Sequence, residues 1–158
     1  MRHRRLRVEP LEDPRLMAVV ITEVHSNPDN PVECLSFTDL YALVGPESQG
    51  FANWEDAQDL ATELGSTTVF PDAPLTITGP GEESGTYDFF VEKAIAPIAQ
   101  ARGQEAFTRP DYQASANDLT IVEGVAGTAG NTTTLGWVGF AFVEENLDRI
   151  KPLQVDDG

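Results

Sequence analysis

Residues 79–90 constrain the fold of this chain most, and they read Gly-Pro-Gly-Glu-Glu-Ser-Gly-Thr-Tyr-Asp-Phe-Phe. The preceding residues 74–78 alternate in character and are rich in β-branched side chains, which predicts a strand. Apolar residues then recur at helical spacing from Tyr87 to Ile98, so we expect a helix to begin near Ser84. A strand, a glycine-rich turn and a helix in succession are typical of an α/β fold.

The turn would place Ser84, Gly85 and Thr86 at the N-terminus of that helix. Backbone N–H groups at a helix start, together with the positive end of the helix dipole, favour an anion. Two hydroxyl groups and a glycine, which lets the backbone approach closely, are the groups that an oxyanion needs. A second interpretation stays open, because serine and threonine are also ordinary N-cap residues of a strand-to-helix turn.

The charge of the chain is strongly negative and unevenly distributed. Its 158 residues fit one small domain, and its formal net charge is −16. Residues 1–15 contain five arginines and three acidic residues, which leaves five basic and 23 acidic residues in 16–158. A body this acidic repels nucleic acid and anionic membrane surfaces, so we expect neither as a partner. An anion would gain no long-range attraction, and its binding would rest on local dipoles and one or two arginines.

Few residues suit catalytic, metal or redox chemistry. Cys34 is the single cysteine, so no disulfide can form within the chain. His3 and His25 have no neighbours at metal-ligand spacing, and two histidines give no support for a Ser-His-Asp or Cys-His arrangement. We therefore expect no enzyme activity, no cofactor and no metal site. The longest apolar run, residues 16–21, is too short for a membrane span or a usual secretory signal core.

Strand and helix patterns alternate along the chain, which predicts a central mixed sheet of about five strands with helices on both faces. The expected strands are 19–24 (a buried parallel strand), 75–78, 135–143 and 151–155. The expected helices are 38–44 capped by Ser36 or Thr38, 53–64 capped by Asn53, 84–97 kinking or ending at Pro97, 117 or 118 to about 124, and a helical turn at 144–148. Residues 99–116 indicate an irregular loop, and 125–134 a flexible turn.

Eight segments in one order give the chain a family resemblance. They are Cys34-Leu35-Ser36, Asn53-Trp54, 70–75, 79–90, 109–115, 122–127, 135–141 and Glu144-Glu145-Asn146. From about Val19 to Val155 the chain resembles the substrate-binding protein of the bacterial high-affinity phosphate ABC transporter. More narrowly, it resembles the subgroup in which Gly-Pro-Gly shortly precedes Ser-Gly-Thr. The resemblance implies the type II periplasmic-binding-protein fold, a role in phosphate transport, and inorganic phosphate as the ligand.

Members of that family hold the anion between two α/β lobes, and this chain resembles the second lobe only. The resemblance therefore implies a partial phosphate-binding-protein-like domain over residues 18–158. It also implies two partners, a missing first lobe and an ABC transporter permease. The ligand-binding residues that it implies are Ser84, Gly85, Thr86 and Arg109, with no catalytic residue.

The role of Arg109 depends on a departure from the family pattern. The best-known members place an arginine four residues before the motif serine, where this chain has Pro80. The Gly-Pro-Gly subgroup shares that departure and keeps an Arg-x-Asp-Tyr element, here residues 109–112, so Arg109 would clamp the anion. The alternative is a surface arginine paired with Asp111. Glu83 also has two interpretations, as the proton acceptor for monohydrogen phosphate or as a first-turn acid.

Residues 4–18 resemble the Leu-Glu-Pro-type leader of many exported planctomycete proteins. Their mixed charge and two prolines oppose packing, so we expect residues 1–17 to be a disordered basic leader. The alternative is a ragged gene start with a few arginines. The leader interpretation implies an exported protein, periplasmic or at the cell surface, with no membrane insertion.

Two functions from different classes follow from these observations. The chain would bind phosphate, or another tetrahedral oxyanion, as the substrate-binding component of a phosphate ABC uptake system. Alternatively, it would be a truncated or split lobe with little affinity alone, acting as a structural or interaction piece.

Overall fold

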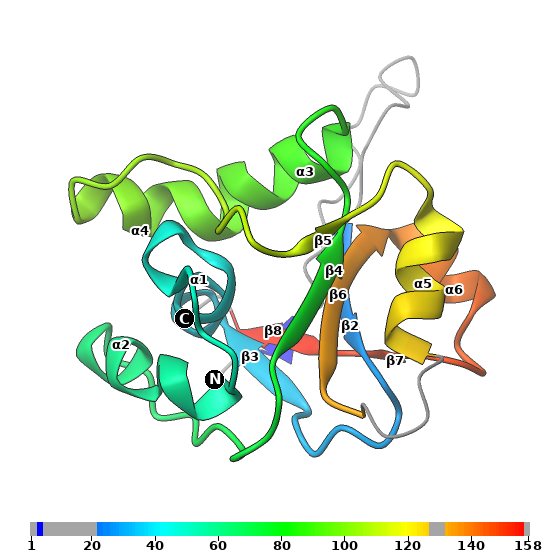
Figure 1. Cartoon of the computed structure of the whole chain (residues 1–158), viewed down its shortest axis with the longest axis horizontal. Coiled ribbons are helices and arrows are strands. Elements are labelled where there is room, and N and C mark those ends of the chain that lie inside the picture. The colour runs from blue at the N-terminus through cyan, green and yellow to red at the C-terminus, as the bar shows by residue number, and fades with distance from the viewer. Residues whose placement is uncertain (1–2, 5–21, 127–131, 157–158) are drawn as a thin grey trace.

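The computed structural model describes residues 3–4, 22–126 and 132–156, and its largest element is a mixed five-stranded sheet (Figure 1). The strands are β2 (Thr22–Ser26), β4 (Thr76–Gly79), β5 (Gln113–Ala114), β6 (Thr134–Gly139) and β7 (Lys151–Pro152), in the spatial order β5-β4-β6-β2-β7. β4 runs parallel to β5 and β6, whereas β2 runs antiparallel to β6 and β7. The predicted α/β fold with a central mixed sheet is confirmed.

The direction of β2 differs from the expectation. The apolar run 19–24 predicts a parallel strand, but β2 pairs antiparallel with both of its neighbours. Its buried residues also differ in polarity, since Val24 lies between the buried Glu23 and His25. An apolar run indicates burial on both faces and carries no information on strand direction. Residues 19–21 lie outside the described residues.

A second, smaller sheet has three short strands in the order β1-β8-β3. They are β1 (His3–Arg4), β3 (Cys34–Ser36) and β8 (Gln154–Asp156). The single strand expected at 151–155 is therefore two strands in two sheets, separated by the fully buried Leu153. β1 departs from the expected disordered leader at two residues, because its backbone pairs with the otherwise open edge of β8. The other residues of 1–17 lie outside the described residues.

Three helices begin where the sequence predicts their caps. α1 (Phe37–Val44) follows Ser36, whose hydroxyl accepts the N–H of Asp39 while the Asp39 carboxylate accepts the N–H of Ser36. The 3-10 turn η2 (Trp54–Ala57), which continues into α2 (Gln58–Glu63), has the same reciprocal cap between Asn53 and Asp56. The Asn117 side chain accepts N–H groups at the start of α5 (Asp118–Ala126). These caps satisfy N–H groups that the first helical turn leaves without partners.

One long helical rod follows β4. It comprises α3 (Gly85–Phe90), the π-helical segment η3 (Val91–Ile95) and α4 (Ala96–Ala101). The sequence predicts that this helix kinks or ends at Pro97, but helical structure continues to Ala101. The wider turn of η3 changes the hydrogen-bond pattern just before Pro97, so the N–H that proline lacks is not required there.

The apolar run 135–143 forms a strand and then a helix. β6 ends at Gly139, and α6 (Phe140–Glu145) follows directly, so the predicted strand is wrong beyond Gly139 and the predicted helical turn at 144–148 begins too late. An uninterrupted apolar run suits a buried strand and a buried helix equally well, and its periodicity does not separate them. Of the turn predicted at 125–134, residues 127–131 lie outside the described residues.

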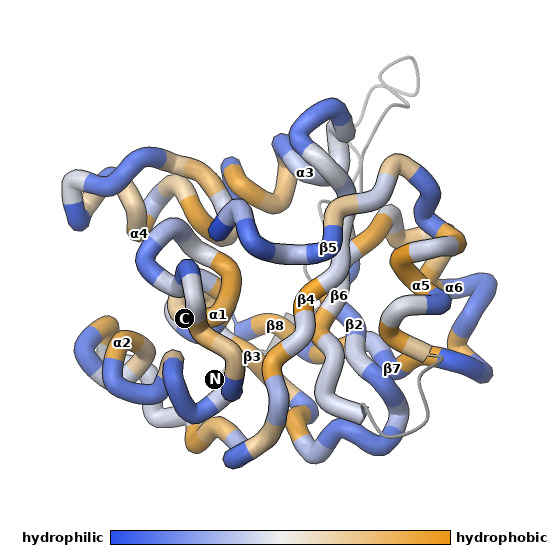
Figure 2. The backbone as a smooth tube through the Cα atoms, in the orientation of Figure 1, coloured by the Kyte–Doolittle hydropathy of each residue, from blue (hydrophilic) through white to orange (hydrophobic). Residues whose placement is uncertain are grey.

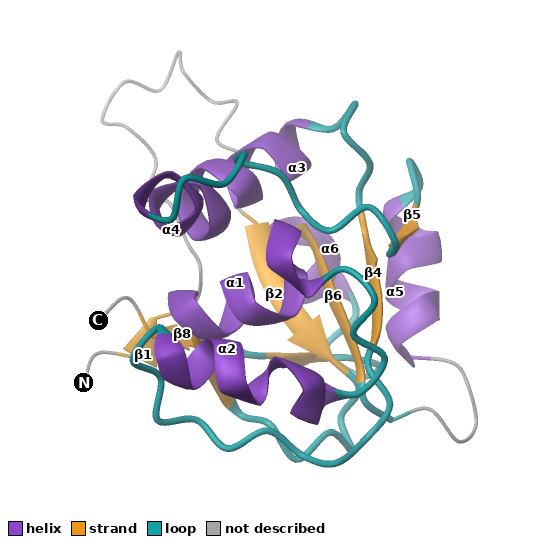
Figure 3. Cartoon of the chain, turned by 60° about the vertical axis from the view of Figure 1, so that its left-hand side comes forward, coloured by secondary structure: helices purple, strands orange, loops and turns teal. Residues whose placement is uncertain are grey.

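Helices cover both faces of the five-stranded sheet (Figure 3). On one face, α1 and the rod pack over Val24, Leu135 and Trp137 in one apolar cluster. On the other face, α5 and α6 pack against Val138 in a smaller cluster. β6 contributes to both clusters because successive side chains of a strand point to opposite faces. Polar residues lie mainly in the connections, including the 3-10 turn η1 (Pro46–Ser48) and most of the segment between α4 and β5 (Figure 2).

Candidate functional site

Ser84 is the N-cap of the helical rod. Its hydroxyl accepts the N–H of Thr86 at 3.1 Å, and its carbonyl accepts the N–H of Asp88. The Ser84 N–H donates to the carbonyl of Gly81 at 3.0 Å, which closes the turn that follows β4. Ser84, Gly85 and Thr86 therefore lie together at the start of the rod, just beyond the carboxyl end of β4.

The cap at Ser84 differs from the caps at Ser36 and Asn53. In those two caps, an aspartate carboxylate at the third helical position accepts the N–H of the cap residue. At the Ser84 cap, the third helical position is Tyr87, which has no carboxylate. The reciprocal carboxylate of the other two helix starts is thus missing here, although Asp88 lies one position further on. Here the Gly81 carbonyl accepts the Ser84 N–H in place of that carboxylate, so an anion from outside the chain would bind this helix start through other groups, such as the Gly85 N–H and the Ser84 hydroxyl.

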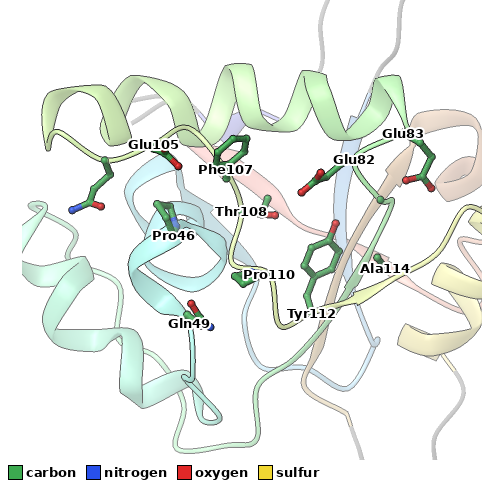
Figure 4. Close-up of a pocket in the computed structure, with 12 residues that line it drawn as sticks. Pro46, Gln49, Glu82, Glu83, Glu105, Phe107, Thr108, Pro110, Tyr112 and Ala114 are labelled. Atoms are coloured by element: carbon green, nitrogen blue, oxygen red, sulfur yellow. The ribbon is translucent and has the colours of Figure 1, made fainter.

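A groove of about 780 Å³ opens beside this turn (Figure 4). Its walls come from η1 and the residue after it, from the turn before Ser84, and from the segment that leads from α4 to β5. The lining residues are Pro46, Gln49, Gly81, Glu82, Glu83, Gln104, Glu105, Phe107, Thr108, Pro110, Tyr112 and Ala114. Phe107 is 51% exposed there, so the groove has an apolar part that solvent reaches.

The charges that line the groove are negative. Glu82, Glu83 and Glu105 carry them, and among the described residues no lysine or arginine lines the groove. The Glu83 carboxylate bends back over Gly81, since a Cβ at position 81 would collide with it. This position leaves both interpretations of Glu83 open. In electrostatic terms the groove disfavours an anion unless cations or further N–H donors come from elsewhere.

Arg109 is buried and bound within the molecule. Its Nε and Nη2 donate to the Asp111 carboxylate at 2.7 and 2.8 Å, and Nη2 also donates to the Phe51 carbonyl at 2.9 Å. The hydrogen bonds from Arg109 lower the pKa of Asp111 to about 2. The pairing with Asp111 agrees with the alternative interpretation from the sequence, but the arginine side chain is only 5% exposed and so is not a surface residue. Its Nη1 is buried without a hydrogen-bond partner among the described residues.

Arg109 and the Ser84 turn border different cavities. Arg109 lines a small cavity of about 120 Å³ with Asp111, Gln113 and residues 75–77, and it does not line the groove. Those residues precede the carboxyl end of β4, whereas Ser84 follows it. The structure therefore brings Ser84, Gly85 and Thr86 together and sets Arg109 apart from them. The sequence does not reveal this separation, because it does not show along which part of β4 the segment after α4 returns.

Three aromatic residues beside the turn were not identified as site residues from the sequence. Tyr112 lines the groove and donates its hydroxyl to the Pro80 carbonyl at 2.5 Å. Its ring lies 5.2 Å from that of Trp137, which stacks on Phe90 at 4.6 Å between centroids. All three fall within segments that carry the family resemblance. An aromatic residue in such a segment is equally compatible with a core position, so only the fold reveals their place at the turn.

Comparisons with known proteins point to phosphate-binding proteins. No protein-family model matches the chain. Protein SphX of Synechococcus elongatus is 32% identical over 130 residues, which cover 82% of this chain. The phosphate-binding protein PstS of Staphylococcus epidermidis is 28% identical over 89 residues, or 56% of the chain. The crystal structure of a possible phosphate-binding protein from Planctomyces limnophilus superposes on 87% of the chain with a TM-score of 0.65 and 25% identity.

The chain spans less than half the length of the proteins it matches. The matched region is 33% of SphX, 23% of the staphylococcal PstS and 42% of the Planctomyces structure. The mixed sheet with helices on both faces thus resembles part of the fold of that possible phosphate-binding protein.

Proposed function

We propose that this chain is a phosphate-binding component of an ABC-type phosphate uptake system, and that it is not an enzyme. The observation that carries the proposal is the Ser84 helix start, which has no carboxylate at its third helical position and directly follows residues 81–83, which line an open groove. The similarity to proteins named for phosphate binding supports the same conclusion. Phosphate would accept hydrogen bonds from the Gly85 N–H and from the hydroxyl groups of Ser84 and Thr86, since the N–H groups of Ser84 and Thr86 already donate within the turn.

Arg109 belongs to the proposed site on one condition. Two of its guanidinium nitrogens are bound to Asp111, and Nη1 is the nitrogen left for an anion. Because Arg109 does not line the groove, it would contact a phosphate at Ser84 only if the segment around residues 109–112 moved on binding. In the absence of such a movement, Ser84, Gly85 and Thr86 form the site alone.

A partner surface is part of this proposal. The matched proteins are more than twice as long as the matched region, which agrees with a second lobe that supplies donors. We propose that such a lobe, and then a transporter permease, are the partners. None of the helices in the described ranges is long and apolar enough to cross a membrane. An exported location, periplasmic or at the cell surface, fits the resemblance to substrate-binding proteins.

We expect the isolated chain to bind phosphate weakly, as a lobe that completes its site with a partner would. A charge-assisted hydrogen bond contributes roughly 1.5–3 kcal/mol net. If about four such bonds come from a second lobe, their loss weakens binding by several kcal/mol even after discounting for retained hydration. Since 1.4 kcal/mol is about tenfold, a micromolar site would become millimolar or weaker.

Amide NMR shifts in the purified chain test the proposal. Titration with phosphate at constant ionic strength should shift the Gly85 and Thr86 resonances with a Kd of about 1 mM or above. Sodium chloride is the control for ionic strength, and the Asp39 amide at the Ser36 cap is the internal control, because that helix start already holds a carboxylate. No shift at Gly85 or Thr86 up to about 50 mM phosphate, some fiftyfold above a millimolar Kd, would overturn the proposal. Low-micromolar binding that Ser84→Ala abolishes would instead show that the chain is sufficient alone.

A further inference from the structure

Tyr112 connects the groove to the turn that precedes Ser84. It is half-buried, it lines the groove, and its hydroxyl donates to the Pro80 carbonyl at 2.5 Å. Figure 4 shows the Tyr112 side chain rising from the segment before β5, with its hydroxyl toward the turn that carries Glu82. Burial raises the pKa of Tyr112 to about 12, so the hydroxyl keeps its proton at neutral pH and remains a donor.

The start of the same turn, at Gly79, packs against the ring of Trp137. A Cβ at Gly79 would lie 2.7 Å from ring atoms of Trp137, so the backbone there is in direct contact with the ring face or edge. Trp137 is fully buried between Phe90, which belongs to α3, and Tyr112. The backbone adds a further tie, because the Ser115 N–H donates to the Gly79 carbonyl at 2.9 Å. The turn is therefore held in place by the contact of Gly79 with Trp137 and by the hydrogen bond from Tyr112 to Pro80.

We propose that Tyr112 is a positioning residue for the oxyanion turn, and this inference rests on the proposed phosphate site. Its hydroxyl has two effects. It fixes the peptide group of Pro80 and so the direction in which the following turn presents the Gly85 N–H and the Ser84 hydroxyl. It also donates to the Pro80 carbonyl, next to Gly81 of the groove lining, and so reduces the partial negative charge that this oxygen presents to a phosphate near the turn. Because its one proton is already donated to Pro80, Tyr112 acts on the anion through the turn and not as a direct donor.

The test compares Tyr112→Phe with Tyr41→Phe in the full chain. Both substitutions remove one hydroxyl that donates a hydrogen bond, since the Tyr41 hydroxyl donates to Glu47 at 2.7 Å, but Tyr41 is fully buried, does not line the groove and, among the described residues, forms no hydrogen bond with the turn at 79–84. We expect Tyr112→Phe to raise the phosphate Kd about 5- to 10-fold in the NMR titration, which corresponds to the loss of one neutral hydrogen bond. Tyr41→Phe should leave the Kd unchanged.

Amide hydrogen exchange gives a readout that does not depend on phosphate. Exchange across residues 81–86 should accelerate in Tyr112→Phe and stay at the wild-type rate in Tyr41→Phe, while urea unfolding shows whether the two variants lose similar stability. Unchanged exchange at 81–86 together with an unchanged Kd would overturn the positioning role. If wild type shows no phosphate shift but Tyr112→Phe still loosens the turn, the positioning role stands and the phosphate proposal fails.

Discussion

Arg109 is held inside the molecule by hydrogen bonds to Asp111 and to the Phe51 carbonyl, while its own N–H donates to the Val44 carbonyl. Asp111 in turn accepts the N–H of Gly50. The Arg109–Asp111 ion pair lies in the segment after α4, and the hydrogen bonds around it join that segment to residues 44–51. At the scale of single residues, the arginine that the sequence suggests as an anion clamp also has a structural role.

Removing that arginine should destabilise the fold. We expect Arg109→Ala to lower the free energy of unfolding by roughly 3 kcal/mol, because it removes the cation paired with Asp111 and the donor to the Phe51 carbonyl. Arg102→Ala is the matched control: Arg102 also pairs with carboxylates, but it is 25% exposed, so solvent screens its ion pairs and a smaller loss is expected. Urea unfolding measures both. Equal losses in the two variants would contradict a special role for burial at Arg109.

His25 makes stability depend on pH. It is fully buried in β2, and burial lowers its pKa to about 4, partly offset by the contact with the Glu23 carbonyl. The unfolded chain binds the proton near pH 6.5, so the stabilisation is complete above that pH and is lost as the pH falls toward 4, by roughly 3 kcal/mol in all. Urea unfolding between pH 7 and 4.5 should therefore show a steeper decline in wild type than in His25→Gln. Parallel pH profiles would contradict the assignment, because every other titrating group is shared.

At the scale of elements, two glycines should respond in opposite ways to alanine. In β4, Gly79→Ala would drive a methyl group into the ring of Trp137, which Phe90 and Tyr112 prevent from moving, so we expect a loss of about 2 kcal/mol. In α5, the nearest atom to a Cβ at Gly124 is 3.4 Å away on Thr78, and alanine favours the helix by up to about 1 kcal/mol. Thermal unfolding of both variants checks the contrast. A Gly79→Ala protein as stable as wild type would show that the contact with Trp137 relaxes.

Helix starts, which depend on residues close together in the sequence, were predicted better than strand directions, which depend on residues far apart. Ser36, Asn53 and Asn117 mark helix starts because their side chains bond N–H groups within three residues, and a cap needs no other part of the chain. The direction of β2 depends on β6 and β7, which lie far along the chain, and local sequence does not encode it. The candidate site divides in the same way: the Ser84 turn is local and was predicted, whereas the places of Arg109 and Tyr112 depend on the fold.

At the scale of the whole molecule, the net charge of −16 should govern how salt affects binding. The repulsion of phosphate extends over about 8 Å at 150 mM ionic strength and about 3 Å at 1 M. We therefore expect the phosphate Kd to decrease severalfold between those two ionic strengths, contrary to the usual weakening of anion binding by salt. The NMR titration repeated in sodium chloride measures this. A Kd that rises with salt would instead indicate that nearby cations dominate the site.

The pairing of β2 and β3 has a consequence for synthesis of the protein on the ribosome. Thr22 of β2 pairs with Gly139, and Cys34 of β3 pairs with Gln154. More than a hundred residues must therefore be translated after β2 or β3 before the strand that pairs with it has been made. Until then their backbone edges are open to other nascent chains, which is the condition that chaperones relieve. Because β7 and β8 lie within residues 151–156, neither sheet is complete until that short stretch has emerged from the ribosome.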